Sequence, residues 1–259
     1  MNHLRELISH AHLILSFARR DLRAKYKQTF FGAAWAVIQP LSLMVVFTLV
    51  FSMFARVDSE GVPYPIFAYS ALIFWTFFAS CVSQGTIAMT ANAALVRKIW
   101  FPRETLLLAV MISAFVDLAV AAIVLAGMFV YYQIAVSWTV FWVVPLLALQ
   151  ILFTLAVILV TSPMHVHFRD IGHALPLLLQ LWMFATPVAY PLGSVPEWLR
   201  PLYMLNPMAG IVDGYRRVLL RGLPPDFTVL GVALVVAMLC CAGAYLLFKR
   251  AERTFADII

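Results

Sequence analysis

The sequence predicts an all-α integral membrane protein with six transmembrane helices. Of its 259 residues, 64% are hydrophobic and 12% are charged, and the mean hydropathy is +0.94. A soluble domain carries about 25% charged residues. The charged residues of this chain are too few to cover the surface of a soluble protein. The charges are also grouped, and they leave uncharged windows longer than the roughly 20 residues that cross a bilayer. These observations argue against an ordinary soluble domain.

The first element is expected over residues 4–28. Apolar residues recur there every three or four positions, at Leu4, Ile8, Ala11, Leu15, Ala18 and Leu22. This spacing is typical of an amphipathic helix. The segment is too polar to span, and its basic end leads into the first apolar window. We therefore expect a helix on the cytoplasmic membrane surface. It is either a simple anchor or a helix that also docks a cytosolic partner, and the residues leave both open.

The transmembrane spans follow from the uncharged windows. They are expected over residues 30–55, 66–92, 105–131, 138–163 and 227–248, with a shorter fifth span in chain order over 173–190. After that short span come several prolines and an amphipathic stretch. Irregular backbone is tolerated at membrane depth only where protein or water surrounds it. We therefore expect re-entrant or interfacial helices over residues 195–220, on the extracytoplasmic side.

The basic residues indicate the orientation. With both termini in the cytoplasm, thirteen Lys and Arg residues lie inside and five lie outside, a clear positive-inside bias. The five outside are Arg56, Arg200, Arg216, Arg217 and Arg221. The net charge of +6 arises beside apolar runs, where it suits anionic lipid headgroups. We therefore expect membrane lipids as partners, and no nucleic acid.

Four stretches carry a family resemblance. They are RRDLRAKYKQTFFGAAWAVIQPL at 19–41, RKIWFPRETLLLA at 97–109, HFRDIGHALPLLLQLWMFATPVAYP at 167–191 and LNPMAGIVDGYRRVLLRG at 205–222. In this order they resemble the ABC-2 type permeases that export polysaccharides such as O-antigen, capsule and teichoic acid. The resemblance covers almost the whole chain, which would form a single ABC-2 transmembrane domain over residues 1–259.

The resemblance implies a function in transport. Two permease copies would form a pore and pair with two copies of a separate ATP-binding subunit, which holds the ATP and Mg, so this chain needs no cofactor. The cargo would be a lipid-linked polysaccharide exported across the bacterial inner membrane. The chain itself would not be an enzyme, and it contains no G-x-x-x-x-G-K-[ST] motif. The alternatives are an ABC-2 permease for a drug or lipid and an integral-membrane glycan transferase, which would need clustered acids.

The resemblance also implies coupling and gate residues. The N-terminal helix and the loop near residues 94–103 would touch the ATPase, together with an Arg-Asp pair after the fourth span. The coupling residues are Arg19, Arg20, Asp21, Arg23, Arg97, Lys98, Arg169 and Asp170. Gate helices would run over Val195–Leu205 and Ala209–Leu220, with Trp198, Arg216 and Arg217. The two arginines would contact glycan phosphates or lipid headgroups, or simply cap the helix.

Three further features remain. Aromatic faces stack on sugar rings and would line a channel, although membrane proteins also carry lipid-facing aromatics. The candidates are Phe31, Trp35, Phe47, Phe51, Trp182, Phe184 and Tyr190. Asp117 lies within a span and either pairs with a neighbouring helix or contacts substrate or protons; pairing is favoured because no second intramembrane acid accompanies it. His165 and His167 lack further ligands, so we expect no metal site.

Overall fold

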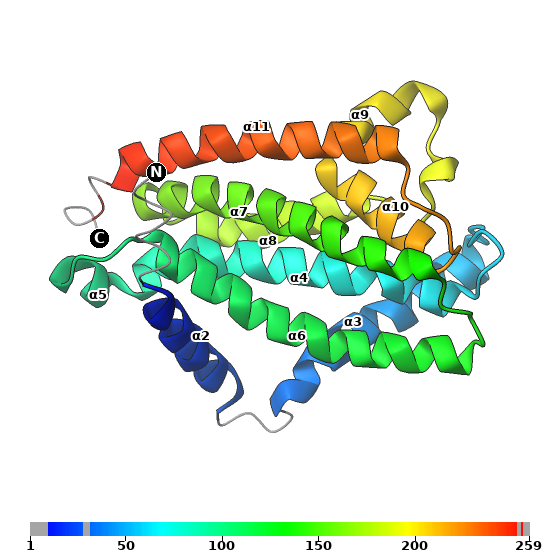
Figure 1. The fold of residues 1–259 in the computed structure, drawn as a ribbon, viewed down its shortest axis with the longest axis horizontal. Helices are drawn as coiled ribbons and strands as arrows, with labels where there is room; N and C mark the ends of the chain where they lie inside the picture. The colour runs from blue at the N-terminus through cyan, green and yellow to red at the C-terminus, as the bar shows by residue number, and fades with distance from the viewer. Residues whose placement is uncertain (1–9, 28–31, 253–254, 256–259) are drawn as a thin grey trace.

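The computed structural model describes residues 10–27, 32–252 and 255, and every regular element in this part of the chain is helical (Figure 1). The predicted all-α class is therefore confirmed. Phe31 and residues 4–9 of the predicted N-terminal helix lie outside the described residues. The helices with α geometry are α2 (Ala11–Tyr26), α3 (Trp35–Phe47), α4 (Tyr64–Ala91), α5 (Ala93–Lys98), α6 (Glu104–Tyr131), α7 (Val143–His167), α8 (Ile171–Phe184), α9 (Arg200–Met204), α10 (Pro207–Leu219) and α11 (Phe227–Ala251).

Five helices in the described part are long and apolar enough to cross a membrane. They are Trp35–Phe54, Tyr64–Ala91, Glu104–Tyr131, Trp138–His167 and Phe227–Ala251. The long helices run side by side along the long axis of the molecule (Figure 1). Helix α8 is also apolar, but its 14 residues are fewer than the roughly 20 that cross a bilayer as a helix. A total of six spans therefore stays a prediction.

Helix α4 forms the centre of the bundle. In the apolar 18-residue stretch of α4, 78% of the residues are buried. The corresponding shares are 11% for Trp35–Phe54 and 22% for α11. Helices α3, α6, α7 and α10 all pack on α4. Close approach needs small residues, and at Gly85 an added Cβ would lie 2.6 Å from Cγ2 of Ile158 on α7. Helices α3 and α11 are therefore peripheral and present most of their apolar surface outward.

The first span is not one uniform helix. A 3₁₀ turn, η1 (Gly32–Ala34), precedes α3, and a π-helical segment, η2 (Thr48–Phe54), follows it. Pro40 removes one backbone donor within α3. The hydroxyl of Thr48 then donates to the carbonyl of Met44 over 2.7 Å, a local bond that competes with the regular helical ladder. The apolar sequence predicted a span here, but it did not predict these changes in helix type.

The segment after α8 also differs from the predicted helix over 173–190. Helix α8 ends at Phe184, and Pro187 lies in the non-helical stretch that follows, consistent with the bias of proline against a continuing helix. Two 3₁₀ turns, η4 (Leu192–Ser194) and η5 (Glu197–Leu199), then lead into α9 and α10. A third 3₁₀ turn, η3 (Trp138–Trp142), opens the span that continues into α7. Helices α9 and α10 lie at the opposite end of the bundle from α5 (Figure 1).

Candidate coupling, channel and gate sites

Asp117 lies at the middle of α6 and binds the last turn of α2. One carboxylate oxygen accepts a hydrogen bond from Nζ of Lys25, and the other accepts one from the hydroxyl of Tyr26. The side chains of Lys25 and Asp117 are 34% and 16% exposed. Burial, reinforced by the hydrogen bond to Asp117, raises the pKa of Tyr26 above its usual range, so the hydroxyl stays protonated as a donor. Asp117 therefore has the pairing with another helix that the sequence favoured.

A small cavity of about 60 Å³ adjoins this contact. It opens among α3, α4 and α6, and its walls combine apolar side chains with the polar groups of Gln39, Thr76 and Ser80. Lys25 and Asp117 form part of the same lining, together with Trp35. A cavity of this size with polar groups in its wall has room for one or a few waters. The charged pair thus borders a small cavity with a few polar groups inside an otherwise apolar bundle.

The predicted coupling residues lie on α2, on α5 and in the turn between α7 and α8. The start of α2, helix α5, that turn and the end of α11 share one end of the bundle (Figure 1). Arg20 pairs with its neighbour Asp21 over 2.9 Å. The other predicted coupling residues are exposed; they are Arg19, Arg23, Arg97, Lys98, Arg169 and Asp170. Helix α5 and the turn before α8 therefore share one end of the bundle, and α2 starts at that end and leads toward Asp117 (Figure 1).

An ion-pair cluster fixes the loop before α6 to the end of α11. Nζ of Lys249 lies 2.5 Å from Oε1 of Glu104 and 2.8 Å from Oε2 of Glu252. Arg103 donates to the main-chain carbonyl of Glu252 and lies 5.5 Å from the ring centre of Phe255. Glu104 is buried, so its charge requires this pairing. These contacts tie the residues that lead into α6 to the end of α11.

The described channel candidates from the sequence take several different positions in the structure. Phe47 is buried between Phe51, with ring centroids 5.5 Å apart, and Phe184, with centroids 6.3 Å apart, which joins the first span to α8. Trp182 instead packs edge-on against Phe78 and Phe153 inside the bundle. Its indole nitrogen donates to Oδ1 of Asn206 over 3.2 Å. The remaining candidates take separate positions: Trp35 is exposed beside the Asp117 cavity, and the hydroxyl of Tyr190 contacts that of Tyr203 over 2.8 Å.

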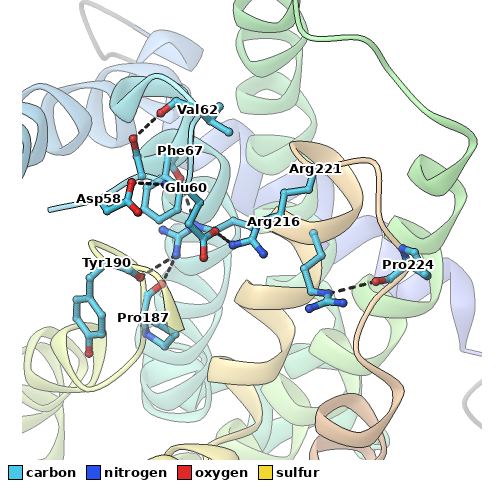
Figure 2. A network of polar contacts seen from close by, with 11 residues as sticks. Asp58, Glu60, Val62, Phe67, Pro187, Tyr190, Arg216, Arg221 and Pro224 are labelled. Carbon is cyan, nitrogen blue, oxygen red and sulfur yellow. Dashed lines mark hydrogen bonds and ion pairs between the residues drawn. The ribbon is translucent and has the colours of Figure 1, made fainter. Parts of the chain in front are cut away.

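Arg216 of α10 organises the opposite end of the bundle. Only 2% of the residue is exposed. Its guanidinium donates to the carbonyls of Pro187 at 2.6 Å, Tyr190 at 3.0 Å and Phe67 at 3.4 Å, as well as to Val188 (Figure 2). These bonds hold the irregular stretch after α8 against α4 and α10. The geometry gives Arg216 a positioning role within the protein, which was not among the roles considered from the sequence.

Two further contacts secure the same end. Arg221, beyond α10, forms an ion pair with Glu60 in the loop between the first span and α4 (Figure 2). Arg217 donates to the carbonyl of Pro224 over 3.2 Å. Glu60 and Gly61 have φ of 60° and 80°, which marks a tight turn. Trp198, the remaining gate candidate, is exposed on η5.

The two histidines do not assemble a metal site. Nδ1 of His167 lies 2.9 Å from the carbonyl of Pro163, and His165 is buried against Gly172. Within the described residues, no three His, Cys, Asp or Glu side chains gather closely enough to hold a metal ion.

Comparison with known proteins places the chain in a family. The ABC-2 type transporter family matches residues 12–220. The chain belongs to the ABC-2 type transporter family. It is 29% identical to an O-antigen export system permease protein of Myxococcus xanthus, over 99% of this chain and 98% of that one. It is 26% identical to an O-antigen export system permease protein of Klebsiella pneumoniae over 95% of each chain. It is also 20% identical to a polysialic acid transport protein of Escherichia coli, over 78% and 79%.

Three residues of this ABC-2 chain were not singled out from the sequence. Ile99 and Trp100, just after α5, are 58% and 77% exposed, and Phe168 in the turn before α8 is 68% exposed. All three lie at the end that carries the predicted coupling cations. The signal was present in the sequence, because aromatic residues interrupt basic and polar segments outside the spans. Large apolar side chains exposed close together mark surfaces that contact a protein or the membrane.

Proposed function

We propose that this chain is the membrane-spanning permease subunit of an ABC exporter that carries a lipid-linked polysaccharide across the bacterial inner membrane. The observation that carries the proposal is the near end-to-end similarity to proteins named for O-antigen export. The polysialic acid transport protein adds a second, different glycan. Because the relatives are named for different glycans, the proposal commits to a class of cargo and leaves the sugar unspecified.

The energy would come from a separate ATPase subunit that holds ATP and Mg. The sequence of this chain has no Walker A motif, and the described helices leave only short connections between them. The docking surface would combine the exposed cations of α2 and α5 with Ile99, Trp100 and Phe168. A few buried aromatic anchors dominate most protein interfaces, and Trp100 is the strongest candidate for one.

A pore would form between two copies of the chain. The first span and α8 meet through Phe47 and Phe184. Around this junction both helices expose apolar side chains, namely Val45, Val46, Leu49, Val50, Leu177, Leu178, Leu181 and Phe184. Two such faces opposite one another would enclose a passage lined by aliphatic and aromatic groups, which lets sugar rings stack and slide. Two ATPase copies would then serve the dimer.

The proposed topology has six spans and both termini in the cytoplasm. Helix α8 and the irregular residues that follow it would cross the membrane as the fifth span in chain order. Such a backbone is tolerated because it is enclosed by protein: Arg216 and Tyr64 satisfy carbonyls at Pro187 and Ala189. The elements η5, α9 and α10 would then form the gate on the extracytoplasmic side. The excess of Lys and Arg at the opposite end supports this orientation.

The test is to purify the chain with the ATPase encoded beside it and to measure ATP hydrolysis with and without lipid-linked glycan. We expect a stable complex whose ATP hydrolysis rises when the glycan is added. Stimulation by hydrophobic drugs or phospholipids alone would favour the alternative ABC-2 cargo. A neighbour without a nucleotide-binding motif, or failure of the two proteins to associate, would contradict the proposal.

A further inference from the structure

Helix α2 is attached to α6 at two separate places. Near the start of α6, Ile14 and Ala18 pack on Ala109 in a small apolar cluster. At the midpoint of α6, Lys25 and Tyr26 bind Asp117. Ala109 and Asp117 are eight residues apart, which is about 12 Å along a helix. A helix fixed at one point pivots about it, whereas two contacts this far apart resist rotation.

The second attachment is electrostatically demanding. A carboxylate within a membrane-spanning helix requires a partner, because an unpaired charge is costly at that depth. Among the described residues that line the adjoining cavity, Lys25 is the one cation. Gln39, Thr76 and Ser80 offer dipoles that would solvate Asp117 without neutralising it. The end of α2 is therefore held at α6 by a charge that nothing else in the lining would neutralise.

The same helix also reaches the coupling loop. The ring of Phe17 on α2 lies 5.9 Å from that of Phe101, in the loop between α5 and α6. On its other face, α2 exposes Arg19, Arg20 and Arg23 at the proposed ATPase surface. Helix α2 thus lies between that surface and the middle of a membrane span, with contacts to both.

We propose that Asp117 is a positioning residue for transport: by holding Lys25 and Tyr26, it makes α2 and α6 move as one unit. Movement of α2 driven by the ATPase then shifts the bundle instead of bending α2 away from it. The inference rests on the proposed function, since it concerns how ATP hydrolysis is linked to movement of cargo. It differs from a plain anchoring role, in which Asp117 would affect assembly of the complex alone.

The test uses the complete complex with its ATPase in lipid vesicles. Asp117→Asn removes the charge at constant size, Lys25→Met removes the partner from a helix outside the bundle core, and Lys25→Asp combined with Asp117→Lys exchanges the pair. Lys27→Met is the matched control, because Lys27 is exposed two positions further along the chain. Three quantities are measured: yield of the complex, glycan exported per ATP hydrolysed, and amide hydrogen exchange in residues 19–26.

In both single variants we expect complexes in normal yield that still hydrolyse ATP. Glycan exported per ATP should fall about tenfold or more, because loss of either charge releases the end of α2 from α6. The rate of amide hydrogen exchange in residues 19–26 should rise in both single variants. The double variant with the charges swapped should recover most of the export and most of the protection from hydrogen exchange. Lys27→Met should behave like the unmodified protein. The proposal is overturned if the single variants export the normal amount of glycan per ATP hydrolysed. It is also overturned if export falls only in proportion to a lower yield of the complex. If the unmodified complex exports no glycan, the proposed function fails. The amide hydrogen exchange rates still test whether Asp117 holds α2 on α6.

Discussion

The guanidinium of Arg216 lies 3.6 Å from the ring centre of Phe67, with its donors directed at main-chain carbonyls. A planar cation stacked on an aromatic face and bound by several acceptors is an arrangement that Arg provides and Lys does not. Phe67 belongs to α4, the most buried helix of the bundle. The stretch after α8 is therefore positioned by one side chain of α10 that is itself fixed to the core.

Replacing Arg216 by Lys should destabilise the protein by about 2 kcal/mol or more, because the ammonium cannot keep all the carbonyl bonds and leaves acceptors buried without partners. The matched control is Arg217→Lys, where a partly exposed side chain makes a single bond to Pro224. Unfolding of the purified protein in mixed micelles measures both changes. Equal effects of the two substitutions would show that Arg216 has no special positioning role.

Gly85→Ala should destabilise the bundle by about 1–3 kcal/mol, since the added methyl would overlap Ile158 and force α4 and α7 apart. Gly127→Ala on α6 meets open space and should be neutral or up to about 1 kcal/mol stabilising. The same unfolding measurement compares the two. A tolerated Gly85→Ala would mean that α4 and α7 are not packed as closely as described.

Trp182 and Phe184 should separate stability from transport. Trp182 is half-buried and packs edge-on against the buried Phe78 and Phe153, so Trp182→Ala should cost about 2 kcal/mol or more of stability. Phe184 is 45% exposed, so Phe184→Ala should cost less than about 1 kcal/mol yet slow glycan export about tenfold if its ring lines the channel. Export is measured in vesicles and stability in micelles. Normal export by Phe184→Ala would remove this residue from the channel.

Trp100→Ala should weaken binding of the ATPase without changing the fold. The side chain is 77% exposed, so its loss leaves no cavity within the chain. An aromatic anchor in a protein interface is worth about 2 kcal/mol or more, which predicts at least about a thirtyfold loss of affinity. Trp138→Ala, at the opposite end of the bundle and 69% exposed, is the control. Binding is measured by titrating purified ATPase onto the permease, and equal affinities for both variants would argue against this docking surface.

Helix positions were predictable wherever charges or turn residues mark the ends. Helices α4 and α6 begin and end within two residues of the expected 66–92 and 105–131. Helix α4 begins at Tyr64, within the proline-containing sequence VPYP at residues 62–65, and Arg103 directly precedes α6. The division of the first span into α and π segments was not predictable, because apolarity sets whether a segment enters the membrane and says little about its hydrogen-bond pattern.

The polar contacts were only partly predictable. A charge within a span requires a partner, so the pairing of Asp117 followed from its place in the sequence. The identity of Lys25 did not, because the two residues are 92 positions apart and helix packing brings them together. Arg216 looked like a surface residue of an amphipathic helix. Its burial depends on carbonyls that Pro187 and its neighbours leave without helical donors, which only the three-dimensional arrangement reveals.

The central claim is that this chain moves a lipid-linked glycan when a partner ATPase hydrolyses ATP. The most direct measurement places the purified complex in sealed vesicles with lipid-linked glycan on the ATPase side and follows its arrival on the other side with a glycan-binding lectin. The account predicts transfer that requires ATP, ceases when the ATPase cannot hydrolyse it, and falls when Trp100 is replaced by Ala. Transfer at the same rate without ATP, or hydrolysis of ATP with no transfer, would contradict it.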